Sequence, residues 1–150
     1  VESIKQTLVL LGLHHIRAWV SLLTLSSLDD KPDELMATAM IRAKMCEQLA
    51  ERAGILSADV YFTAGLFSTL DALLDMSMED IMEQLPLAAE LTAALLDREG
   101  SMGMALDCVV AYERGEWDAV VFRDLEPHDI RGAYLEAVEW SQSAGREIGL

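Results

Sequence analysis

The sequence predicts an all-α protein, a bundle of six to eight helices with no sheet. Apolar residues recur three and four positions apart in almost every segment, and apolar–polar alternation never extends beyond a few positions. Hydrophobic residues make up 52% and charged residues 25% of the 150 residues, which is typical of a globular chain. A chain of this length buries about two thirds of its unfolded surface. We therefore expect it to fold without a disulfide or a structural metal.

The first third of the chain predicts three helices, over residues 3–11, about 13–25 and about 34–53. Gly12 and Gly54 stand just past two of these segments, where helices favour glycine. Polar residues up to Pro32 separate the second helix from the third.

The remaining sequence predicts five more helices. One starts at Ser57 or Asp59 and carries apolar residues at every fourth position, and a short one is entered at Ser77 and stops before Pro86. The last three cover about 87–99, 105–114 and 130–143, with Gly100 to Gly103 as a linker between the first two of them. The expected core contains Trp19, Met40, Cys46, Phe62, Leu66, Leu70, Leu95 and Val109. We expect residues 1–122 to form the helical domain and residues 123–150 to add a loop and a helix packed on it or extending it.

The charge balance excludes several partners. The chain has 26 acidic and 11 basic side chains and a net charge of −15, which repels nucleic-acid phosphates and anionic lipid. No signal peptide or membrane-spanning segment is visible. Cys46 and Cys108 lie in apolar helical stretches without a Cys-x-x-Cys spacing, as expected for buried thiols in a reducing compartment. We therefore expect a cytoplasmic protein that binds neither nucleic acid nor membrane.

Residues suited to catalysis or metal binding are few. The three histidines are His14, His15 and His128. Neighbouring residues on a helix point about 100° apart, so the first two cannot hold one metal together. His128 and Asp129 spell the dipeptide of a metal-dependent phosphohydrolase, but they follow Pro127 in an expected loop near the end of the chain, and a two-residue match has almost no specificity. The chain also lacks a glycine-rich phosphate loop and a nucleophile elbow. From its residues alone, it is interpreted as an interaction domain.

Several local motifs follow one another along the first 117 residues. They are Ser3-Ile-Lys-Gln-Thr-Leu-Val-Leu-Leu-Gly12, Ile16-Arg-Ala-Trp19, Arg42-Ala-Lys-Met-Cys-Glu, Ala64-Gly-Leu-Phe-Ser-Thr-Leu-Asp71, Leu85-Pro-Leu87, Ala94-Leu-Leu96 and Tyr112-Glu-Arg-Gly-Glu-Trp117. Together they resemble a known family, the HDOD (HD-related output) domain of bacterial signalling proteins. The resemblance is greatest to the HDOD domain that follows an EAL cyclic-di-GMP phosphodiesterase domain, and it covers residues 1–117.

The resemblance implies an HD-like helical fold in which the phosphohydrolase metal site has decayed. Related catalytic domains place Gly-Leu-Leu-His-Asp where this sequence reads Gly65-Leu-Phe-Ser68-Thr69, so two hydroxyls replace two ligands. It further implies no catalytic residue, metal or cofactor in this chain, and a fused EAL phosphodiesterase domain in the full-length protein. The family's leading helices have no counterpart ahead of Ser3.

We therefore expect a non-catalytic output module of a cyclic-di-GMP-related regulator, acting by contact with a protein partner or a neighbouring domain. A degenerate metal-dependent HD phosphohydrolase is one alternative. A small-ligand or nucleotide sensor is another, with a remnant pocket around Arg42, Ser68 and Asp71, although an internal Arg42–Asp71 pair is the simpler expectation.

An apolar stripe near the start of the chain predicts an interaction surface. Ile4, Leu8 and Leu11 follow helical spacing and, without the family's leading helices, would leave apolar surface uncovered. We expect this surface to support a weak, salt-promoted homodimer, because salt screens the repulsion between two acidic chains.

Overall fold

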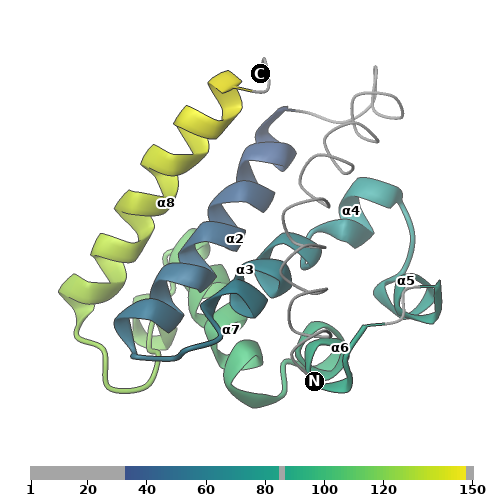
Figure 1. Ribbon diagram of the computed structural model, residues 1–150, viewed down its shortest axis with the longest axis horizontal. Helices are drawn as coiled ribbons and strands as arrows, with labels where there is room; N and C mark the ends of the chain where they lie inside the picture. The colour runs from purple at the N-terminus through teal and green to yellow at the C-terminus, as the bar shows by residue number, and fades with distance from the viewer. Residues whose placement is uncertain (1–32, 85–86, 148–150) are drawn as a thin grey trace.

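The computed structural model describes residues 33–84 and 87–147, and every regular element in these ranges is helical. The predicted all-α class is confirmed, since no strand occurs in the described part of the chain. The expected helices over 3–11 and 13–25 lie outside it. The elements, labelled in Figure 1, are α2 (Asp33–Arg52), α3 (Ala58–Phe67), α4 (Leu70–Leu74), α5 (Met78–Gln84), α6 (Ala89–Asp97), α7 (Gly100–Arg114), the 3-10 helix η1 (Trp117–Ala119) and α8 (Pro127–Glu147).

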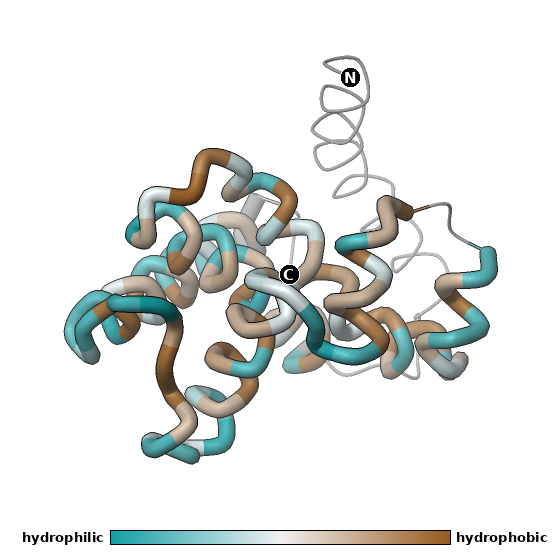
Figure 2. The backbone as a smooth tube through the Cα atoms, turned by 90° about the horizontal axis from the view of Figure 1, so that it is seen from below, coloured by the Kyte–Doolittle hydropathy of each residue, from teal (hydrophilic) through white to brown (hydrophobic). Residues whose placement is uncertain are grey.

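Helix α2 is the centre of the bundle. It packs most extensively along α3 and α8 and also contacts α7, and Figure 1 shows it running between α8 and α3. Its inward residues Met45, Cys46 and Leu49 have no exposed surface. Figure 2 shows apolar and polar stretches alternating within the helices, as burial of one face requires.

The predicted core is confirmed where the structure describes it. Seven of the eight expected core residues are at most 7% exposed, namely Met40, Cys46, Phe62, Leu66, Leu70, Leu95 and Val109. The eighth, Trp19, lies outside the described residues. Phe122 was not expected in the core, yet it is completely buried and meets the ring of Tyr61 edge to face at 6.5 Å.

The single helix expected from Ser57 through Leu74 is wrong in one respect, because the chain forms two helices there. Helix α3 ends at Phe67 and α4 begins at Leu70. Between them, Ser68 and Thr69 donate their hydroxyl protons to the carbonyl oxygens of the preceding turn. Bonds of this kind bend or interrupt helices.

The glycine linker expected between two later helices is also wrong, since Gly100 to Gly103 form the first turn of α7. A Cβ atom at Gly103 would lie 2.1 Å from the carbonyl oxygen of Arg98, so only glycine permits this close turn. Helix α8 likewise begins earlier than expected. Pro127 occupies its first position, where proline is favoured, and the Asp129 carboxylate accepts a hydrogen bond from the Glu126 N–H at 3.0 Å.

Candidate functional site

A polar cluster lies where α2, the end of α3 and α7 meet. Its members are Arg42, Ser68 and Glu113, and we call it the Arg42 cluster. The Arg42 guanidinium donates to both carboxylate oxygens of Glu113, from Nε at 2.8 Å and from Nη2 at 2.9 Å. Its Nη1 also donates to Ser68 Oγ at 3.4 Å. The Arg42 and Glu113 side chains are 20% and 24% exposed, so this ion pair is partly shielded from water.

A close crossing of two helices positions this cluster. A Cβ atom at Gly65 would lie 2.4 Å from the carbonyl oxygen of Arg42, so the backbones of α2 and α3 touch at this glycine. Ser68 follows one turn later, at the end of α3. The Arg42 side chain therefore reaches both the end of α3 and the last turn of α7, which carries Glu113.

The hydroxyls of Ser68 and Thr69 form hydrogen bonds to the backbone. Ser68 donates its proton to the carbonyl oxygen of Gly65 at 2.7 Å, and Thr69 donates to that of Leu66 at 2.9 Å. Ser68 is 7% exposed and Thr69 is 2% exposed. A cation bound at Ser68 Oγ would lie beside the guanidinium of Arg42, which would repel it. The local electrostatics therefore oppose the binding of a cation at Ser68.

The expected remnant pocket is only partly assembled. Arg42 and Ser68 meet, but Asp71 is exposed, and its Oδ1 accepts a hydrogen bond from the Ala72 N–H at 2.9 Å. The expectation that Arg42 pairs with Asp71 is wrong, because its carboxylate partner is Glu113. The sequence signal that could have identified Glu113 is its place in the motif Tyr112-Glu-Arg-Gly-Glu-Trp117.

The other candidate residues from the sequence lie elsewhere in the chain. Ile4, Leu8, Leu11, His14 and His15 lie outside the described residues. His128 is in the first turn of α8, where its Nε2 lies 3.5 Å from Oδ1 of Asp129. Within the ranges 33–84 and 87–147, no group of three or more His, Cys, Asp or Glu side chains is placed to hold a metal ion. In the same ranges, no helix is long and apolar enough to cross a membrane.

The two cysteines are buried free thiols on neighbouring helices, α2 and α7. Burial raises the pKa of the Cys108 thiol to about 11 and raises that of Cys46 still further. The thiolate is the reactive form, so both protonated thiols are unreactive at neutral pH. This agrees with the structural role expected for them.

An aromatic groove, here called the Trp117 groove, opens beside the Arg42 cluster. Tyr112 packs on Trp117 with ring centroids 5.2 Å apart and on Tyr134 at 4.6 Å. Trp117 is 64% exposed, which is unusual for so large an apolar side chain. The groove has a volume of about 580 Å³ and is lined by Thr38, Ile41, Tyr112, Glu113, Arg114, Gly115, Trp117 and Tyr134.

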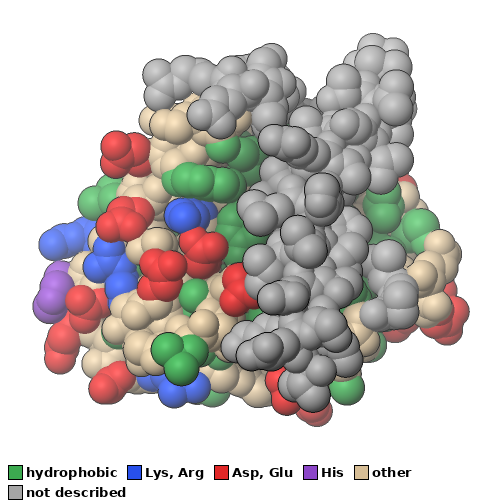
Figure 3. All heavy atoms as spheres, viewed as in Figure 1, with side chains coloured by type: hydrophobic (Ala, Val, Ile, Leu, Met, Phe, Trp, Pro, Cys, Tyr) green, Lys and Arg blue, Asp and Glu red, His purple; other side chains and the backbone are tan. Residues whose placement is uncertain are grey.

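Charged side chains cover much of the neighbouring surface. Figure 3 shows acidic and basic side chains interspersed on the face that carries α8 and α2. On this face Arg52 of α2 pairs with Glu136 of α8 at 3.0 Å. The fold and the site together define a helical domain with a self-contained polar cluster and an adjoining aromatic groove.

Comparison with known proteins gives two relatives. The chain is 38% identical over 154 residues to the cyclic di-GMP phosphodiesterase CdgJ of Vibrio cholerae, a match that covers 99% of this chain. It is 34% identical over 146 residues to the protein YuxH of Bacillus subtilis, covering 93% of this chain. The chain spans 36% of the length of each relative. No protein-family model matches the sequence, and no solved structure matches it.

Proposed function

We propose that this chain is a non-catalytic output module of the HDOD type within a cyclic-di-GMP-related regulator, and that it acts by protein contact. Similarity to a protein named as a cyclic di-GMP phosphodiesterase supports the link to this nucleotide. The match occupies 36% of that protein, so most of the relative lies outside the part that resembles this chain. The motifs that resemble the HDOD domain support the assignment to that type.

One observation carries the non-catalytic part of the proposal: the polar side chains of the Arg42 cluster form their hydrogen bonds with one another and with nearby backbone carbonyls. A hydrolytic metal site gathers several anionic or imidazole ligands around an open position for water. Here the serine and threonine hydroxyls donate to backbone carbonyls, and a guanidinium bound to Glu113 lies beside Ser68. These contacts favour a structural role for the cluster, which ties α2, α3 and α7 together.

The Trp117 groove is the surface that we assign to protein contact. Tryptophan and tyrosine are enriched at interfaces, where they bury large areas with little loss of side-chain entropy. Trp117 packs edge to face on Tyr112, a contact that favours one orientation of its ring before a partner arrives. We propose that the partner is a neighbouring domain of the same polypeptide, an EAL phosphodiesterase domain, and that the groove transmits its state.

The test uses the complete polypeptide that carries this chain. Trp117→Ala should change the rate of cyclic di-GMP hydrolysis at least threefold, because it removes the main anchor of the contact. Leu56→Ala is the matched control, since Leu56 is 96% exposed and does not line the groove, and it should leave the rate unchanged. Equal rates for Trp117→Ala and the unmodified protein would overturn the assigned surface. Hydrolysis of cyclic di-GMP by the isolated chain would overturn its non-catalytic role.

A further inference from the structure

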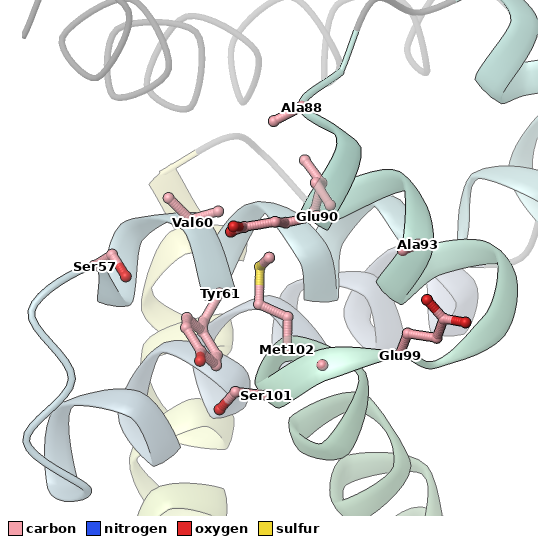
Figure 4. A pocket seen from close by; sticks show the side chains of 11 residues that line it. Ser57, Val60, Tyr61, Ala88, Glu90, Ala93, Glu99, Ser101 and Met102 are labelled. Atoms are coloured by element: carbon pink, nitrogen blue, oxygen red, sulfur yellow. The ribbon is translucent and has the colours of Figure 1, made fainter. Parts of the chain in front are cut away.

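A second cavity lies at the opposite end of α3, where three helices begin. It has a volume of about 580 Å³, within the range of small-molecule sites. Figure 4 shows its walls rising from the starts of α3, α6 and α7. We call it the helix-start cavity, and it is lined by Ser57, Val60, Tyr61, Ala88, Glu90, Leu91, Ala93, Glu99, Gly100, Ser101 and Met102.

All three helices start without a side-chain cap. The residues at the cap positions are Ser57, Ala88 and Glu99, and none of them makes a capping hydrogen bond. In α6 and α7 the backbone amides of residues 89–91 and 100–102 precede the first i to i−4 bonds, which Thr92 and Gly103 donate. Amides at helix starts point outward as donors and carry partial positive charge, a combination that favours anions.

An independent observation comes from Tyr61, which is only 5% exposed and lines this cavity. Its ring packs edge to face on Phe122, yet its hydroxyl makes no hydrogen bond to any residue in the described ranges. Figure 4 shows the Tyr61 side chain reaching along the cavity wall towards Ser101. Buried hydroxyls are normally hydrogen-bonded, so an unpartnered one inside a cavity indicates a ligand atom that would pair with it.

The positively charged side chain of Arg123 contacts Ser101, one of the residues that line the cavity. Arg123 donates to Ser101 Oγ from Nη2 at 2.9 Å and from Nε at 3.3 Å. Among the described residues, it has no carboxylate within ion-pair distance, although the chain is strongly acidic. Its guanidinium is therefore available to a negative group placed against Ser101.

Two carboxylates among the lining residues oppose an anion, and their placement limits where it can sit. Figure 4 shows the Glu99 carboxylate turned away from Tyr61 and Ser101, whereas that of Glu90 lies near Val60. A negative head group is therefore favoured at the start of α7 and disfavoured at the start of α6. The apolar side chains of Val60, Leu91 and Met102 leave the rest of the cavity suited to an apolar body.

We propose that the helix-start cavity binds a small organic anion, with a phosphate or carboxylate head on an apolar body. The head group accepts hydrogen bonds from the amides that open α7 and from the hydroxyls of Tyr61 and Ser101, with Arg123 supplying the counter-charge. This site is separate from the Arg42 cluster and gives the module a place where a metabolite signal can enter.

The test is isothermal titration calorimetry on the purified chain at fixed ionic strength, with phenyl phosphate, benzoate and benzyl alcohol as probes. The two anions should bind, and the neutral alcohol should bind at least tenfold more weakly. Tyr61→Phe and Arg123→Gln should each weaken binding of phenyl phosphate at least fivefold, whereas Glu90→Gln should strengthen it. Arg131→Gln is the matched control, because this exposed arginine lies on α8 away from the cavity, and it should change nothing.

Three outcomes would overturn the proposal. They are equal affinity for the alcohol and the anions, unchanged binding in both Tyr61→Phe and Arg123→Gln, and an equal loss in Arg131→Gln and Arg123→Gln, which would show general charge attraction. Circular dichroism on each variant establishes that it is folded. Because the assay needs no partner domain and no cyclic di-GMP, its failure would leave the proposed protein contact standing.

Discussion

The polar groups at the two ends of helix α3 differ in whether they have hydrogen-bond partners. At its end, Ser68 and Thr69 donate to backbone carbonyls, and Arg42 joins Ser68 to Glu113. At its start, Ser57 forms no cap, and the buried hydroxyl of Tyr61 makes no bond to the described residues. The polar groups at one end are bonded to one another and to the backbone, whereas those at the other end keep donors available.

This difference teaches that a ligand site is better identified by polar groups that lack a hydrogen-bond partner than by residues that match a motif position. Polar groups that already have partners must lose those bonds before they can bind anything else. Polar groups without a protein partner in a cavity exchange only their bonds to water when a ligand enters. We therefore interpret the Arg42 cluster as structural and the helix-start cavity as open to a ligand.

The largest expected effect on stability is at Gly65, where α2 and α3 cross and position the Arg42 cluster. Gly65→Ala places a methyl group against the backbone of Arg42 and Ala43, which cannot move aside, and should lower the free energy of unfolding by about 3 kcal/mol or more. In Gly132→Ala the new atom meets only the flexible end of Arg52, 3.1 Å away, so the loss should be small or absent. Urea unfolding of both variants measures this contrast. Equal stability of the two variants would show that the α2–α3 crossing is not tight.

The buried thiols of Cys46 and Cys108 should not react with thiol reagents until the chain unfolds. Because burial raises the pKa of Cys108 to about 11, its thiolate fraction at pH 8 should be about a hundredfold below that of an ordinary cysteine. Labelling with a thiol reagent should therefore follow unfolding, in the single-cysteine variants Cys46→Ala and Cys108→Ala alike. Rapid labelling of either folded variant would contradict the packing of α2 against α7.

The same raised pKa values predict a direction for the dependence of stability on pH. Unfolded cysteines lose their protons near pH 8.5–9, whereas the folded chain keeps its thiols protonated to higher pH. The unfolded state then binds fewer protons, so this contribution to stability is complete below about pH 8.5 and is lost as the pH rises towards about 11. Cys108→Ala should show a shallower decline over this window than the unmodified chain.

The Arg42–Glu113 ion pair should contribute more to stability than the Arg52–Glu136 pair between α2 and α8. A double-mutant cycle with Arg42→Ala and Glu113→Ala should give a coupling energy of about 1–3 kcal/mol, because both side chains are mostly shielded from water. The matched cycle on Arg52 and Glu136, whose side chains are 29% and 54% exposed, should give less than about 1 kcal/mol. A coupling at Arg42–Glu113 no larger than at Arg52–Glu136 would mean that the cluster does not tie the helices together.

Helix caps offer the smallest and most local comparison. Ser77 Oγ accepts a hydrogen bond from the Asp80 N–H at 3.1 Å, so Ser77→Ala should cost about 1 kcal/mol. Ser57 makes no such bond, and Ser57→Ala should therefore cost only a few tenths of that. Thermal unfolding of the two variants provides the measurement. A larger loss for Ser57→Ala would indicate that the start of α3 is capped in solution.

Local sequence patterns predicted much of the fold. Helical spacing identified α2, α5 and α6 and most of the core, and the Ser77 cap is confirmed. The split between α3 and α4 was missed, because it arises from hydroxyl bonds to the backbone that spacing does not reveal. The first turn of α7 was missed because two glycines indicate a loop unless the close approach to Arg98 is known.

The candidate sites were less predictable, since both depend on contacts between distant residues. Arg42 and Glu113 are 71 positions apart, so no local pattern pairs them, and Asp71 was the nearer choice. The helix-start cavity combines the starts of three separate helices with Tyr61, which no sequence motif marks as a site residue. Such a site becomes visible once the helices are placed in space.

The most direct test of the closed Arg42 cluster is nuclear magnetic resonance of the chain during titration with paramagnetic Mn²⁺. The account predicts no selective broadening of the Arg42, Ser68 and Thr69 amides at one equivalent of the ion, and only weak, dispersed effects near exposed carboxylates. Selective broadening at these three amides, abolished in Ser68→Ala, would show that the position still binds a divalent metal and would contradict the non-catalytic role proposed for this module.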